Sequence, residues 1–142
     1  MGMEGNAIYL PALVMMALTL AVWLRMLAIR VGQMKRERIH PQKVATSAQA
    51  AALLTDSRAS DNFRNLFELP VLFYAAVVVA AQAGQVGPVT LALAWAFVLL
   101  RIAHSAIHCG YNKVMHRFYA YVASGLALWA LCAALAFGLL HE

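Results

Sequence analysis

The sequence has 142 residues, of which 63% are hydrophobic and only 12% are charged. A soluble domain of ordinary composition carries about 25% charged residues, so this chain has too few to cover a surface in water. The composition therefore excludes an ordinary soluble domain and predicts one integral membrane domain over residues 1–142. The formal net charge of +5 does not indicate nucleic-acid binding, because the basic residues fall where membrane topology would put them.

Four apolar segments are long enough to cross a bilayer, which takes about 20 helical residues. In chain order we expect these helices at residues 8–31, 61–83, 89–110 and 114–140. Pro70 lacks the N–H that the second helix needs at that point, so we expect a bend there. Between the first two spans, residues 42–54 are rich in Ala and Gln and predict a short surface helix. Ser60 or Asp61 is the expected N-cap of the second span.

The basic residues predict the orientation of these spans. Every Lys and Arg lies at one end of the four helices or in the two connections there: Arg25, Arg30, Lys35, Arg36, Arg38, Lys43, Arg58, Arg64, Arg101, Lys113 and Arg117. The turn at residues 84–88, at the other end, is uncharged. By the positive-inside rule, the basic loops are cytoplasmic and both termini are outside. The expected fold is an all-α, integral membrane four-helix bundle.

Three of the expected spans carry polar stripes at the same depth. Arg101, His104 and His108 share one face of the third span, at offsets of three and seven residues. The second span presents Asp61, Asn65 and Glu68 on one face, and the fourth presents Arg117, Tyr121 and Ser124. A charged group at the bilayer centre costs roughly 2.5–3.5 kcal/mol or more, so such residues normally face the bundle interior or a wet cavity.

These stripes predict a shared polar cluster. We expect Glu68 to pair with Arg101 or Arg64 and to bond with Asn65 and His104, which leaves Arg117 as a spare cation for an anionic ligand. Three alternatives stay open. A Glu68–Arg101 pair is also what a purely structural tie between helices gives. Arg117 also suits contact with lipid phosphates. His104 and His108 with Glu68 have the composition of an iron or zinc site, but a pair at i and i+4 is a weak signal, and we predict no metal.

At these residues the chain resembles the MAPEG family, the membrane-associated proteins of eicosanoid and glutathione metabolism. The likeness lies in Arg64-Asn65-x-x-Glu68 just before Pro70, and in Arg101-x-x-His104 followed by Arg117. The resemblance implies a homotrimer that binds glutathione at subunit interfaces near the cytoplasmic face.

The resemblance also implies roles for individual residues. Asn65 and Glu68 would bind the peptide part of glutathione, and Arg117 would face the thiol. The remaining members of the implied site are Arg64, Arg101, His104, His108 and Tyr121. Three positions depart from the family pattern. His108 replaces a tyrosine, and Phe118 follows Arg117 where one subgroup of the family has a serine. Asp61 stands where glutathione-using relatives carry an arginine for a glutathione carboxylate. Arg58 or Arg64 is the expected substitute for that arginine.

Two functions follow as hypotheses. The first is a glutathione-dependent transferase or peroxidase that acts on lipophilic electrophiles, with Arg117 stabilising the thiolate. The second is a non-enzymatic membrane protein that binds a lipid or small anion between subunits. Both expect lipids and lipophilic small molecules as partners.

Overall fold

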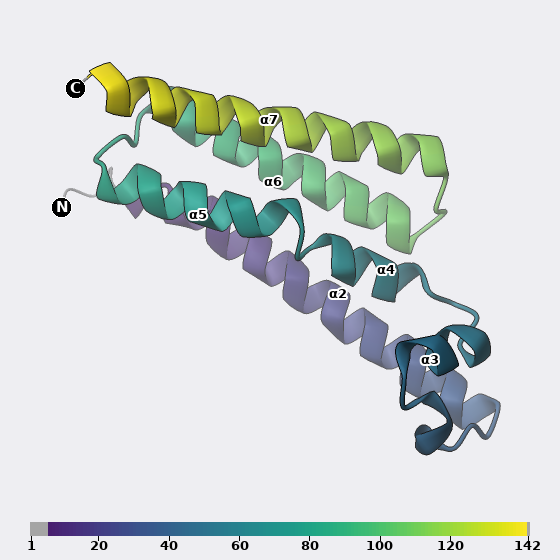
Figure 1. The fold of residues 1–142 in the computed structure, drawn as a ribbon. Helices are drawn as coiled ribbons and strands as arrows, with labels where there is room; N and C mark the ends of the chain where they lie inside the picture. Colours follow the sequence, from purple (N-terminus) through teal and green to yellow (C-terminus); the bar gives the residue numbers. More distant parts are fainter. Residues whose placement is uncertain (1–5, 142) are drawn as a thin grey trace.

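The structure is a computed structural model that describes residues 6–141, and every regular element in that range is helical (Figure 1). The elements in chain order are α2 (Tyr9–Arg36), the 3-10 helix η1 (Pro41–Val44), α3 (Ser47–Leu53), α4 (Arg58–Asn65), α5 (Leu69–Gln82), α6 (Pro88–Cys109) and α7 (Val114–His141). Four segments are long and apolar enough to cross a membrane: α2, α4 with α5, α6 and α7. The expected all-helical fold with four candidate spans is confirmed.

The spans pack as a bundle in which α6 and α7 form a long antiparallel hairpin (Figure 1). The α5–α6 turn, the start of α2 and the end of α7 lie at one end of this bundle. The α6–α7 turn and the segment with η1 and α3 lie at the other end, which is also where the basic residues gather. The apolar core is centred on Phe73 and Phe97, whose rings stack with centroids 4.5 Å apart.

The first connection differs from expectation in two details. Helix α2 continues to Arg36, five residues beyond its expected end. The second span begins at Arg58, so the expected N-cap at Ser60 or Asp61 is wrong. Asp56 explains the earlier start, because its carboxylate accepts the Arg58 backbone N–H at 3.3 Å and binds the Arg58 guanidinium at 2.8 Å. The expected short helix is present as η1 and α3, and α3 starts with a Thr46–Gln49 capping box.

The second span is interrupted rather than merely bent. Helix α4 ends at Asn65 and α5 begins at Leu69, with Pro70 in its first turn, where a missing N–H is tolerated. Glu68 has a non-helical backbone at φ −97° and ψ −106°. Because Pro70 cannot donate to the Leu66 carbonyl, the ladder stops there, and the last turn tightens to bonds such as Phe67 N–H to Arg64 carbonyl.

Candidate functional site

Arg101 of α6 lies opposite the interruption between α4 and α5, and its side chain is fully buried. Its Nη2 donates to the backbone carbonyl of Asn65 over 3.0 Å. The last carbonyls of a helix have no partner within the helix, and inside a membrane such groups must be satisfied by protein. Arg101 therefore caps α4 from a neighbouring helix, which accounts for a cation at this depth.

Tyr121 of α7 links Arg101 to Glu68. The Tyr121 ring lies under the Arg101 guanidinium, with Cζ 5.4 Å from the ring centroid. The Tyr121 hydroxyl donates to Glu68 Oε2 over 3.2 Å. The expected ion pair of Glu68 with Arg101 or Arg64 is wrong: among residues 6–141, Arg58–Asp56 alone has charged atoms within 4.0 Å. Tyr121 therefore contacts both Arg101 and Glu68, where the polar stripes had predicted a direct ion pair between these two residues.

Two histidines stand next to each other on the buried face of α6. His104 and His108 are each only 3% exposed, and their ring centroids lie 5.5 Å apart. His104 Nδ1 lies 2.9 Å from the Arg117 backbone carbonyl, which ties α6 to the first turns of α7. His104 Nε2 and His108 Nδ1 are buried without a hydrogen-bond partner. Within the described part of the chain, no three His, Cys, Asp or Glu side chains are arranged to hold a metal ion.

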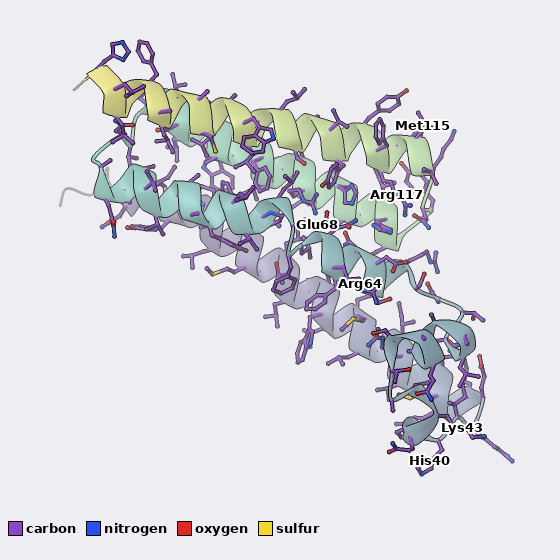
Figure 2. All side chains as sticks on the ribbon, in the orientation of Figure 1. His40, Lys43, Arg64, Glu68, Met115 and Arg117 are labelled. Carbon is purple, nitrogen blue, oxygen red and sulfur yellow. The ribbon has the colours of Figure 1, made fainter. Side chains whose placement is uncertain are left out.

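An open groove of about 430 Å³ lies between α4, α6 and α7. Six of the eight residues expected at the site line it: Asn65, Glu68, His104, His108, Arg117 and Tyr121. The other lining residues are Asp61, Val114 and Phe118. Figure 2 shows Glu68 at the α4–α5 junction and Arg117 near the start of α7. Arg101 lies behind the groove, against Tyr121, and does not line it. The three polar stripes thus meet at one place.

Arg117 is the cation that lines this groove. Its Nη1 donates to Asn112 Oδ1 over 2.8 Å, and in residues 6–141 no carboxylate lies within 4.0 Å of its guanidinium. Asn112 sits in the turn before α7 with a positive φ of 52°, a conformation that Asn adopts more readily than most residues. The amide holds the guanidinium without neutralising it, so its charge is available to a ligand.

Arg64 lies elsewhere. It borders a second groove of about 240 Å³ beside η1 and α3, together with Arg30, and Asp61 lines both grooves. Because α4 ends at Asn65, Arg64 and Glu68 do not belong to one continuous helix, and their i, i+4 spacing does not bring them together.

Two apolar residues of the groove, Val114 and Phe118, were not among the site residues predicted from the sequence. They share the Tyr121 face of α7, at offsets of four and three residues. This spacing could have predicted that the two residues lie beside Tyr121, but apolar residues that face lipid have the same spacing.

Further arginines fix the end of α6 beside the groove. Arg25 Nη2 donates to the Cys109 carbonyl and Arg58 Nη1 to the Gly110 carbonyl, each over 2.8 Å. Cations stabilise the negative end of a helix dipole, so these bonds hold the turn that follows His108. The hydrogen bond from Arg58 also holds the pKa of Asp56 below its ordinary value.

Comparison with known proteins gives one match. The model of the MAPEG family matches residues 8–137 of the sequence. Neither the curated proteins nor the solved structures contain a match.

Proposed function

The chain belongs to the MAPEG family, and from this premise we propose that it is a glutathione-dependent transferase or peroxidase acting on lipophilic electrophiles. The observation that carries the proposal is the guanidinium of Arg117. It lines a groove built from the family's polar residues and has no acidic partner among the described residues.

Arg117 supplies the chemistry of the proposed reaction. A free thiol is mostly protonated at neutral pH, and the thiolate is the nucleophile. A guanidinium held against the sulfur would favour the thiolate by about 1.4–2.7 kcal/mol, which is a ten- to hundredfold gain at equilibrium. In conjugation the proton leaves to water, the sulfur forms a bond to an electrophilic carbon, and the leaving group departs with its electron pair. In peroxide reduction two thiols become one disulfide, while the peroxide becomes an alcohol and water.

The rest of the groove supports binding of both reactants. Asn65 and Glu68 offer an amide and a carboxylate for the peptide of glutathione, and Tyr121 fixes the carboxylate through its hydroxyl. Val114 and Phe118 give the groove apolar walls, and both are well exposed. A substrate dissolved in the bilayer would reach the sulfur past these two side chains.

We further propose that this chain, with residues 1–142 as one membrane domain, assembles as a homotrimer and is oriented with its basic end in the cytoplasm. Large apolar side chains such as Leu13, Leu20 and Leu126 are more than half exposed and need lipid or other subunits around them. Three copies packed through part of this surface would place each groove at a subunit interface. The basic end would face the cytoplasm.

The test is a binding titration on the purified chain in detergent. We expect glutathione to raise the melting temperature and to show the ultraviolet absorbance of a thiolate. Arg117→Ala should keep the fold but lower the thiolate signal at least tenfold, and Arg117→Lys should retain part of it. No binding at millimolar glutathione would overturn the proposal.

One observation favours the second function, a non-enzymatic anion or lipid binder. Arg117 stands next to Phe118, which is 53% exposed, so a phosphate on an acyl chain has a cation and an apolar wall at the same place. This function expects anionic lipid to bind to the groove and no turnover with model electrophiles.

A further inference from the structure

The carboxylate of Asp61 lies in the groove at the end opposite to Glu68. Asp61 Oδ2 accepts a hydrogen bond of 2.7 Å from the Ser57 hydroxyl, and no charged nitrogen of a Lys or Arg side chain lies within 4.0 Å of the Asp61 carboxylate oxygens in residues 6–141. Ser57 is neutral and leaves the negative charge in place. This end of the groove therefore presents an anion to whatever binds there.

The α4 edge of the groove is acidic at both ends. Asp61, Asn65 and Glu68 follow each other along this edge, and six residues lie between the two acids. Asp61 and Asn65 stand one helical turn, roughly 6 Å, apart on α4, and Glu68 lies beyond the break, so the two acids are within reach of the two ends of a short peptide. Tyr121 and the buried Arg101 lie close to Glu68, and Arg117 is the arginine that lines this groove, while Asp61 also borders the neighbouring groove of Arg30 and Arg64.

Glutathione fits this charge pattern poorly at one end. It carries one ammonium group and two carboxylates, one at the γ-glutamyl end and one on the glycine, besides its thiol. Glu68 would take the ammonium group, and Arg117 is already assigned to the sulfur. The glycine carboxylate would then face Asp61, and like charges in direct contact cost several kcal/mol.

The histidines give an independent indication of a ligand at the Asp61 end. His108 lines the groove there and is 3% exposed, with its Nδ1 buried and unpartnered. His104, one turn along the same face, has an unpartnered Nε2. Buried polar atoms in proteins are nearly always hydrogen-bonded. Two histidine nitrogens without a partner beside a groove therefore indicate that a bound ligand forms their hydrogen bonds.

We propose that the groove takes a thiol peptide whose end at Asp61 bears a positive charge instead of a carboxylate. The chemical class is a γ-glutamyl-cysteinyl peptide joined through its C-terminal carboxyl group to a diamine or polyamine by an amide bond. Its free ammonium group would pair with Asp61, its γ-glutamyl ammonium with Glu68, and its amide groups would lie beside Asn65 and the histidines. This inference rests on the proposed function, because it keeps Arg117 at the sulfur.

The experiment compares three probes that differ only at the glycine end: glutathione, its glycine ethyl ester, and its glycine amide with 1,4-diaminobutane. Each is titrated against the purified full chain in detergent at low salt, with the dissociation constant measured by calorimetry. We expect the cationic probe to bind at least about tenfold more tightly than glutathione, with the neutral ester between them. Raising the salt concentration should reduce the differences between the three dissociation constants.

Variants at Asp61 test the assignment to that residue. Asp61→Asn should abolish the preference, Asp61→Arg should reverse it, and Asp61→Glu should keep it. Asp56→Asn is the matched control, because it removes a nearby carboxylate that lies outside this groove, and it should leave the order unchanged.

The outcomes separate this inference from the proposed function. If glutathione binds as tightly as the cationic probe or better, with a thiolate signal that depends on Arg117, the inference is overturned and the proposed function stands. If none of the three probes binds, both are overturned. A preference for the cationic probe that survives Asp61→Asn also overturns the inference, since another group would then be responsible.

Discussion

The two halves of this bundle are filled in different ways. In the half built from α5 and the first turns of α6, the interior is largely apolar, with Phe73 stacked on Phe97 and both rings fully buried. In the half built from α4 and the last turns of α6, the buried side chains include Asn62, Arg101 and His108. The interruption at residues 66–68 is the boundary between them.

The difference shows in which half of the bundle unsatisfied polar groups lower the stability of the fold. Four buried polar atoms in the described chain lack a hydrogen-bond partner, and all four belong to Arg101, His104 and His108 in the polar half. Each such atom costs about 1–3 kcal/mol, whereas a packed apolar interior carries no such penalty. Proteins depart from full polar satisfaction mainly at functional sites. The apolar half therefore holds the bundle together, and the polar half holds the groove.

The largest expected effect is on stability in the apolar half. Phe97→Ala leaves a void of roughly 100 Å³, and at about 24 cal/mol per Å³ this lowers the free energy of unfolding by about 2 kcal/mol. Lipid is as apolar as the side chain, so we add no transfer term. Leu99→Ala is the control on the same helix, because that side chain is 58% exposed and its loss should cost little. Denaturation in detergent measures both, and a loss of glutathione affinity in folded Phe97→Ala would contradict the division into halves.

The next effect is on binding in the polar half. Arg101→Met removes the group that holds the Asn65 carbonyl and the Tyr121 ring, so we expect about tenfold weaker glutathione binding, equivalent to ~1.4 kcal/mol. Its loss of stability should be smaller than that of Phe97→Ala, because the two unpartnered nitrogens of Arg101 disappear as well. Calorimetry and denaturation on the same preparation compare the two. A larger loss of stability than in Phe97→Ala would show that Arg101 is chiefly structural.

A smaller effect is expected where the apolar half contains a polar contact. In the amide orientation that satisfies both of its polar atoms, the Gln85 side chain donates through Nε2 to the Leu135 carbonyl at 3.0 Å and accepts the Leu139 N–H through Oε1 at 2.7 Å. A Cβ on Gly138 would come within 2.5 Å of that amide, so Gly138→Ala should expel it and cost about 1 kcal/mol. Melting curves should show no added loss from Gly138→Ala in a Gln85→Ala background. An additive loss would mean that the contact does not exist.

The smallest effect concerns the Asp56–Arg58 pair outside both halves. Arg58 lowers the pKa of Asp56 in the folded protein, so the pair stabilises the fold above the unfolded pKa of about 3.9 and loses that contribution as the pH falls through the folded pKa. Both side chains are about one-third or more exposed, at 42% and 31%, so water and salt screen the pair and its contribution should be small. Asp56→Asn should lower the melting temperature slightly at pH 7, and this decrease should become smaller as the pH falls below about 4. A decrease that stays the same over this acid range would exclude the ion pair as the cause.

The sequence by itself determined the spans and the polar stripes. Length, hydropathy and a 3.6-residue period are local properties, so residues 8–31, 61–83, 89–110 and 114–140 were recognised close to their observed helices. The same period placed Arg101, His104 and His108 on one face, and they do share a buried face of α6.

Only the tertiary structure decided which of these groups meet. Pro70 indicated a disturbance, but the packing of α6 against it determined that Arg101 would cap the Asn65 carbonyl rather than pair with Glu68. The break also placed Arg64 and Glu68 in different grooves. The helical period of a sequence fixes the direction in which each side chain leaves its helix. Which residue that side chain contacts also depends on the distance and rotation of a second helix, and no local pattern contains this information.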